Sequence, residues 1–179
     1  MVLILNPDNL QAIRAHAERT YPEECCGLLV GHCSAVGEED VREVVNCAAA
    51  ENAWDSEAAA AVGSLSNTVE SETARTKDSR YWIDPRLMLQ VQREARDRNL
   101  NIIGVYHSHP DHAAVPSECD RSLAWPGYSY IIISVAQGKA TDVRSWHLDD
   151  QHQFQAEVMR MGAQPPHTSD LSTPILPKR

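Results

Sequence analysis

Two histidines, a serine and an aspartate are spaced in a way that could hold a metal ion. His107 and His109 stand at the end of an apolar run, and Ser117 and Asp120 follow after a loop. In an extended segment, residues i and i+2 project from the same face, so two imidazoles can reach one ion and the loop can return a carboxylate. Two histidines and one carboxylate leave a fourth tetrahedral position for water, which is typical of a catalytic zinc site. Zn²⁺ lowers the pKa of bound water toward about 7 and polarises a carbonyl, so the pattern favours a hydrolase that also needs a base.

Simpler interpretations exist for the same residues. Ser117 and Asp120 could be only the start of a capped helix, with an acid three residues after the N-cap. The two histidines could be solvated residues of an edge strand. His112 is more readily explained as a solvated loop residue than as a ligand. No CxxC pair occurs, so packed thiols are the favoured interpretation of the cysteines nearest the site, which are Cys25, Cys26 and Cys119.

The sequence resembles the JAMM metallopeptidases of bacterial type, which are the catalytic (MPN-plus) branch of the MPN-domain superfamily. The segment 104–110 reads Gly-Val-Tyr-His-Ser-His-Pro and, with Ser117 and Asp120, matches the family pattern at each signature position. The segment 22–31 resembles the family's Glu-x-Cys-Gly-x-Leu-x-Gly motif. The segment 81–85, Tyr-Trp-Ile-Asp-Pro, is similar to positions common in bacterial members.

The resemblance implies a role for each matching residue. Glu24 is the general base, which takes a proton from a metal-activated water and returns it to the leaving amine. Ser117 hydrogen-bonds the oxyanion of the tetrahedral intermediate. Glu23 is a competitor for the base, and only its register relative to Cys26 and Gly27 places it second. The implied zinc ligands are His107, His109 and Asp120.

The resemblance also implies a substrate. It suggests the isopeptide or C-terminal peptide bond of a ubiquitin-like protein, which in bacteria is usually a β-grasp sulfur carrier ending in Gly-Gly. An extended tail could add as a strand to an exposed sheet edge, with only residues as small as glycine passing to the metal. Trimming of residues after Gly-Gly and release of an amino acid such as cysteine both stay open. The alternatives are a zinc hydrolase of a small molecule and a non-catalytic MPN scaffold.

Composition narrows the class of protein. With 179 residues, 42% hydrophobic and 23% charged, the chain is of ordinary globular type and is expected to form one domain. A net charge of −9 argues against nucleic acid and anionic lipid as partners. The first five residues run into Asn6-Pro7 without a basic region or a long apolar stretch, so we expect no secretory signal, no membrane span and a cytoplasmic protein. The oligomeric state is left open.

The elements that must position these residues follow from caps and periodicity. The resemblance implies an α/β (α+β) fold in which helices flank a curved, mixed and largely antiparallel sheet. Residues 1–161 are expected to form the domain, with a polar insertion at 48–78 that could include one helical turn of its own and a disordered tail at 162–179. Apolar patterns predict strands at 27–31, 41–46, 101–106, 128–135 and 141–148, and helices at 7–21, 85–99 and 149–161.

Overall fold

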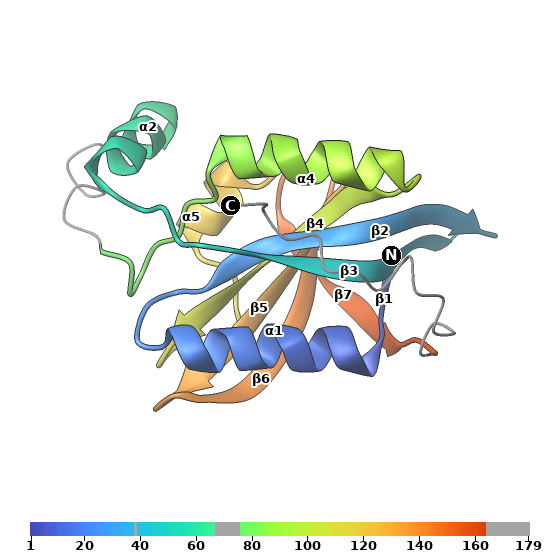
Figure 1. Cartoon of the computed structure of the whole chain (residues 1–179), viewed down its shortest axis with the longest axis horizontal. Helices are drawn as coiled ribbons and strands as arrows, with labels where there is room; N and C mark the ends of the chain where they lie inside the picture. The colour runs from blue at the N-terminus through green and yellow to red at the C-terminus, as the bar shows by residue number, and fades with distance from the viewer. Residues whose placement is uncertain (38, 67–75, 164–179) are drawn as a thin grey trace.

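The computed structural model describes residues 1–37, 39–66 and 76–163, which form a single mixed α/β domain (Figure 1). The expected fold class is confirmed. The helices are α1 (Pro7–Thr20), α2 (Ser56–Ser66), α4 (Pro85–Asp97) and α5 (Glu118–Leu123). The strands are β1 (Val2–Leu5), β2 (Cys26–Val36), β3 (Glu39–Ala50), β4 (Asn101–Pro110), β5 (Ser129–Ala136), β6 (Lys139–Leu148) and β7 (Phe154–Met161).

The strands form one strongly curved sheet that closes on itself in the order β1-β3-β2-β4-β5-β6-β7. Strand β1 closes it, because β1 pairs in parallel with both β3 and β7. Strands β4 and β5 are also parallel, whereas the other neighbours are antiparallel. Strand β4, which carries both histidines, is therefore held on both sides, by β2 and by β5.

Helices α1 and α4 cover opposite faces of this sheet (Figure 1). Each begins at the predicted cap followed by proline: the Asn6 side chain accepts a hydrogen bond from the Asn9 N–H at 2.8 Å, and the Asp84 side chain accepts one from the Arg86 N–H at 2.7 Å. Side chains alternate along β2 between the two faces. Leu28 and Val30 pack in the core under α4, and Leu29 packs in the core under α1.

Two glycines of the β2 motif are required by close contacts. A Cβ atom added at Gly27 would lie 2.3 Å from the ring of Tyr106, and one at Gly31 would lie 1.9 Å from the main-chain oxygen of Glu43. The clash at Gly31 is with backbone, which cannot turn aside as a side chain can. These glycines let β2 pack tightly against β3 and β4, and this packing sets where the residues just before β2 lie.

The helix predicted at 149–161 is wrong. The Asp149 side chain accepts hydrogen bonds from the Gln151 N–H at 2.9 Å and the Gln153 N–H at 2.8 Å, which makes a turn, and β7 follows. The helical spacing of Phe154, Val158 and Met161 misled the prediction, since pairing with β6 and β1 overrides local periodicity. The short strand β1 was not predicted either, since it too depends on pairing with distant strands, β3 and β7.

The polar insertion contains more structure than one helical turn. Residues Ala48 to Ala50 belong to β3, which is longer than predicted, and α2 follows. Trp54, Ala58 and Ala59 form a small apolar cluster against Trp82 and against α5, through Cys119 and Leu123. The insertion thus packs on the helix that carries Asp120.

Parts of the insertion and of the tail lie outside the described residues. These are 67–75 and, from the tail predicted at 162–179, everything after Ala163. The Gly162 N–H donates to the Leu5 carbonyl at 3.0 Å, which extends the contact between β7 and β1 by one residue. Among the described residues, no helix is long and apolar enough to cross a membrane.

A buried ion pair lies where the sheet closes. The Arg42 guanidinium on β3 is 3.4 Å from the Glu157 carboxylate on β7, and the two residues are 6% and 7% exposed. Glu157 also accepts hydrogen bonds from the hydroxyls of Ser129 at 3.0 Å and Ser145 at 2.6 Å. Strands β3, β5 and β6 therefore all contact one carboxylate of β7.

We predict that Glu157→Ala lowers the free energy of unfolding by about 3 kcal/mol, because it leaves a buried arginine without its counter-ion. Urea denaturation measures the change. The matched control is Glu39→Ala, which removes an exposed ion pair with Arg160 at 3.7 Å and should cost roughly 0–1 kcal/mol. Similar small losses in both variants would contradict a structural role for the buried pair.

Candidate metal centre

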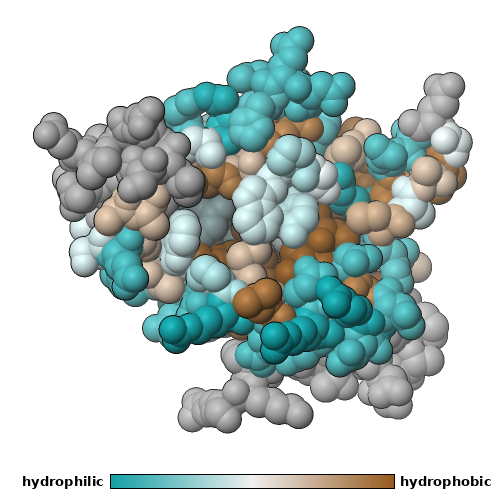
Figure 2. Space-filling view, turned by 90° about the horizontal axis from the view of Figure 1, so that it is seen from above, coloured by the Kyte–Doolittle hydropathy of each residue, from teal (hydrophilic) through white to brown (hydrophobic). Residues whose placement is uncertain are grey.

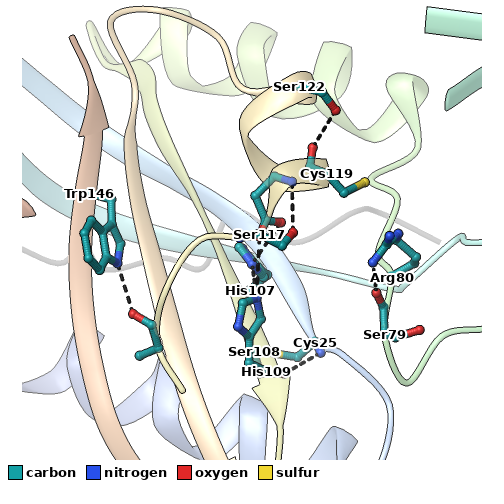
Figure 3. A network of polar contacts seen from close by, with 12 residues as sticks. Cys25, Ser79, Arg80, His107, Ser108, His109, Ser117, Cys119, Ser122 and Trp146 are labelled. Carbon is teal, nitrogen blue, oxygen red and sulfur yellow. Dashed lines mark hydrogen bonds and ion pairs between the residues drawn. The ribbon is translucent and has the colours of Figure 1, made fainter. Parts of the chain in front are cut away.

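The two histidines of β4 project together on the face of the sheet that α4 covers. His107 is fully buried, and its Nε2 atom lies 3.0 Å from Nε2 of His109. Ser108 between them projects to the other side, as the alternation of a strand requires. Figure 3 shows these residues on β4 with Ser117 facing them from the start of α5. The chain thus presents two imidazole nitrogens at one point.

Asp120 reaches the histidines from the first turn of α5. Its Oδ1 atom is 3.3 Å from His107 Nε2, and its Oδ2 atom is 3.6 Å from His109 Nε2. The capping box expected from the simpler interpretation is also present: the Ser117 N–H donates to Asp120 Oδ2 at 2.6 Å, and the Asp120 N–H donates to Ser117 Oγ at 3.1 Å. The two interpretations therefore describe one arrangement, because the cap fixes the orientation of the carboxylate.

These three side chains have the spacing that zinc needs. A tetrahedral zinc with ligand distances of about 2.0–2.1 Å separates its ligand atoms by about 3.4 Å. The separations of 3.0, 3.3 and 3.6 Å between the nearest donor atoms bracket that value. Among the described residues, His107, His109 and Asp120 are the one group of three or more such side chains that could hold a metal. The donor set fits zinc.

The surroundings of the histidines favour a metal at their Nε2 atoms. His109 Nδ1 lies 2.9 Å from the Ala113 carbonyl, and donation to that oxygen leaves the Nε2 lone pair for a cation. The ring of Tyr81 stacks on His107 at a centroid distance of 4.5 Å and restricts its rotation. His107 Nδ1 is buried and has no hydrogen-bond partner among the described residues.

The three side chains influence one another's charge. Burial alone would raise the pKa of Asp120, but His107 and the hydrogen bonds of His107, His109 and Ser117 hold it well below its usual range. Burial lowers the pKa of His107. Burial also opposes protonation of His109, but the hydrogen bond and charge of Asp120 outweigh it and raise the pKa of His109. Zinc binding would therefore displace a proton from His109.

Glu24 lies beside this group, and Glu23 does not. Glu24 is 7% exposed and lines the same cleft as His109, Ser117 and Asp120, whereas Glu23 is exposed and is not part of the cleft wall. Burial raises the pKa of the Glu24 carboxyl to about 8, with the charge of His109 opposing the increase and that of Asp120 adding to it. A general base has to be ionised, and a divalent cation beside the carboxyl would favour that form.

Ser108 fixes the chain next to Glu24. Its Oγ accepts the Cys25 N–H at 2.8 Å, and its own N–H donates to the Cys25 carbonyl at 3.1 Å (Figure 3). The sequence did not single out Ser108, although a polar residue between two histidines in a buried strand was a usable signal. The residue that ties the segment 76–82 to Glu24, Asn52, was missed because it fell within the predicted insertion.

The group opens into a cleft of about 590 Å³ whose walls are mostly apolar. Seen from the α4 side, apolar surface lies in the middle of this face between hydrophilic residues (Figure 2). The apolar part of the lining comes from α4, α5, β5, the segment before α4 and the stretch between α5 and β5, and includes Trp82, Met88, Leu123, Trp125, Tyr128 and Tyr130. Such a cleft has room for an extended peptide next to the metal ligands.

The competing residues are not placed to complete the ligand group. His112 lines the cleft, but it is exposed and is not one of the three converging side chains. Burial raises the pKa of Cys25 to about 12 and raises that of Cys26 as well, which disfavours the thiolate form that a metal needs.

Comparisons with known proteins agree with this geometry. A family profile described as prokaryotic homologs of the JAB domain matches residues 7–149. A CysO-cysteine peptidase of Mycobacterium tuberculosis is 27% identical over 150 residues, covering 83% of this chain and 84% of that protein. A desampylase of Haloferax volcanii is 29% identical over 161 residues, covering 87% and 96%. The solution structure of a Desulfitobacterium hafniense protein has a TM-score of 0.68 at 24% identity, covering 94% and 97%, and so shares the fold.

We predict that the metal-free chain binds one zinc ion and that His109→Ala weakens this binding by more than the roughly 10 to 100-fold that loss of an outer-shell partner costs. Isothermal titration and atomic absorption give the affinity and the stoichiometry. His112→Ala, just after the end of β4, is the control and should bind zinc as the unmodified chain does. Equal losses in both variants would mean that the ligands are assigned wrongly.

Proposed function

Because the chain belongs to the family of prokaryotic homologs of the JAB domain, we propose that it is a zinc peptidase or isopeptidase acting at the C-terminal Gly-Gly tail of a ubiquitin-like protein of sulfur-carrier type. The observation that carries the proposal is the convergence of three metal-ligating side chains, a buried carboxyl and a serine hydroxyl on one cleft. Each of these groups has a separate task in amide hydrolysis.

The names of the relatives support the reaction class and the kind of substrate. One is a peptidase of CysO-cysteine and another is a desampylase. The first name fits the release of cysteine assembled on a carrier, which is one of the two tasks left open by the sequence. The matches cover more than four fifths of this chain and of each relative, so they support a peptidase activity for the domain as a whole.

Glu24 is the proposed general base. Bound zinc would polarise the substrate carbonyl and acidify the attacking water. The Glu24 carboxylate takes the proton from that water and passes it to the leaving nitrogen, so the amine departs uncharged. Its burial in the cleft wall keeps bulk water from competing for the proton.

Ser117 is the proposed oxyanion donor. A hydroxyl has one proton and two lone pairs, and in Ser117 one lone pair is used by the Asp120 N–H. The hydroxyl proton is therefore still available to the developing oxyanion. In other hydrolases, one such donor is worth about 10² to 10³ in kcat.

The closed sheet changes how a tail can bind. Strand addition to an exposed edge was expected, but β4 is paired with β2 as far as His107 and with β5 as far as Pro110. The proposed place for the tail is the cleft, between its apolar walls, with the Gly-Gly carbonyl next to the ligand group. Glycine at these positions lets the backbone approach closely.

We predict that the zinc-loaded protein cleaves a β-grasp sulfur carrier whose Gly-Gly tail is extended by cysteine or by a short peptide, with cleavage directly after the second glycine. Mass spectrometry of the intact carrier identifies the product. Removal of the metal with 1,10-phenanthroline should abolish cleavage, and added zinc should restore it. Zinc binding without cleavage of any carrier would favour a small-molecule hydrolase, and a stably folded chain that binds no zinc would favour a scaffold.

We predict that Glu24→Gln lowers kcat by at least about 10²-fold, since general-base catalysis typically contributes a factor of about 10² to 10⁴ in rate. The substitution is nearly isosteric and leaves the ligands in place, so one zinc should stay bound. Steady-state kinetics on the extended carrier and metal analysis check both outcomes. Glu23→Gln is the matched control and should keep turnover. If Glu23→Gln were inactive and Glu24→Gln active, Glu23 would be the base instead of Glu24.

A further inference from the structure

Asn52 links its own stretch of main chain next to the site to two others, at Glu24 and at 80–82. It follows the end of β3 by two residues and is 6% exposed. Its Nδ2 atom donates to the Glu24 carbonyl at 3.0 Å and to the Arg80 carbonyl at 2.9 Å. Its Oδ1 atom accepts from the Trp54 N–H at 3.0 Å and from the Trp82 N–H at 3.2 Å. Both ends of one amide are thus fully used.

Few other side chains can make this set of contacts. Two donors must face carbonyls while an acceptor on the same short side chain faces two N–H groups. Aspartate of the same size keeps the acceptor but has no donor, and glutamine places the amide one methylene too far out. The orientation of the amide is defined by its main-chain partners, because the flipped amide would face carbonyl with carbonyl and N–H with N–H.

The segment that carries Glu24 is held from two sides. On one side, Ser108 bonds both main-chain groups of Cys25 at 2.8 and 3.1 Å. On the other side, the Glu24 carbonyl contacts Asn52, and the Glu24 N–H donates to the Lys77 carbonyl at 2.7 Å. Glu24 lies before the start of β2, so regular sheet pairing does not hold it. These contacts replace that pairing.

The same side chain holds the cleft wall. The residues from Asp78 to Ile83 line the cleft without belonging to a helix or strand. Asn52 bonds Arg80 and Trp82 within this stretch, and the adjacent Ala53 N–H donates to the Trp82 carbonyl at 2.9 Å. Asn52 does not contact the ligand group, which lies on β4 and α5.

We propose that Asn52 is a positioning residue that holds the base Glu24 and the cleft wall at a fixed distance from the metal ligands by bonding both main chains at once. The part that concerns turnover rests on the proposed function. A misplacement of a reacting group by about 1 Å can cost about 10²-fold in rate, so loss of these contacts acts on kcat while the ligands stay in place.

The test compares Asn52→Ala and Asn52→Asp with the unmodified chain. Hydrogen exchange of the metal-free protein, followed by NMR, is the first measurement and needs no substrate. Asn52→Ala should speed exchange at Trp54 and Trp82 about tenfold, because it removes their acceptor. Asn52→Asp keeps that acceptor and should leave both amides protected. Both variants remove the donor to the Glu24 carbonyl, so both should speed exchange at the Glu24 amide, which is itself bonded to the Lys77 carbonyl. Exchange at β4 amides such as Tyr106 should stay unchanged.

Zinc affinity and turnover are the second measurement. Both variants should bind one zinc with an affinity within about threefold of the unmodified chain, and kcat on the cysteine-extended carrier should fall about 10 to 100-fold and by more than KM rises. The control is Asn9→Ala, which also removes an amide that bridges main-chain carbonyls, those of Val44 and Val45 at 3.4 and 3.3 Å, but far from the site. It should lower the melting temperature without changing kcat or exchange at Glu24.

The outcomes separate the two proposals. If the unmodified chain cleaves no carrier, the proposed function fails, and exchange at the Glu24 amide alone decides whether Asn52 positions the base. Unchanged exchange at Glu24 in both variants overturns the inference. It is equally overturned if the unmodified chain is active and both variants retain its kcat below their melting temperature, since Asn52 would then serve stability only.

Discussion

The site depends on one electrostatic constraint: two imidazoles and a carboxylate must be held within about 3.6 Å of one another in a largely buried place. Burying polar groups face to face is costly unless each has a partner, and a divalent cation is one partner that all three could share. The fold meets the constraint in two ways. Strand β4 is paired on both sides, so His107 and His109 keep the spacing of a regular strand. The capping box of α5 holds Asp120 by the same hydrogen bonds that begin the helix.

The proposed base, Glu24, lies beside the three converging side chains but comes from a different part of the chain, and this explains much of the surrounding structure. Glu24 precedes β2, whose tight packing on β3 and β4 requires the glycines at 27 and 31. Side chains that carry no reacting group, Ser108 and Asn52, bond the main chain on either side of it. Rigid elements thus carry the ligands, while hydrogen bonds to irregular backbone set the base and the cleft wall.

The sequence was informative where contacts are local. The i, i+2 pair of histidines and the i, i+3 pair of Ser117 and Asp120 could be interpreted without a fold, and the caps of α1 and α4 mark helix starts by local hydrogen bonds. Prediction failed where distant residues decide. Residues 154–161 have apolar residues at helical spacing but form β7, because they pair with β6 and β1. The capping box of Ser117 and Asp120 was considered an alternative to a metal site, but it is the contact that orients the Asp120 carboxylate toward the histidines. The side chain of Asn52 bonds nearby Trp54, but its other main-chain partners, at Glu24 and in 77–82, are brought beside it only by the fold.

The most direct test of the account is a crystal structure of the zinc-soaked protein with anomalous diffraction data collected on both sides of the zinc absorption edge. The account predicts one strong anomalous peak, about 2.0–2.2 Å from Nε2 of His107, Nε2 of His109 and one carboxylate oxygen of Asp120, with Glu24 facing it across the cleft. A peak at the cysteines, or no peak at these three side chains in fully occupied crystals, would contradict it.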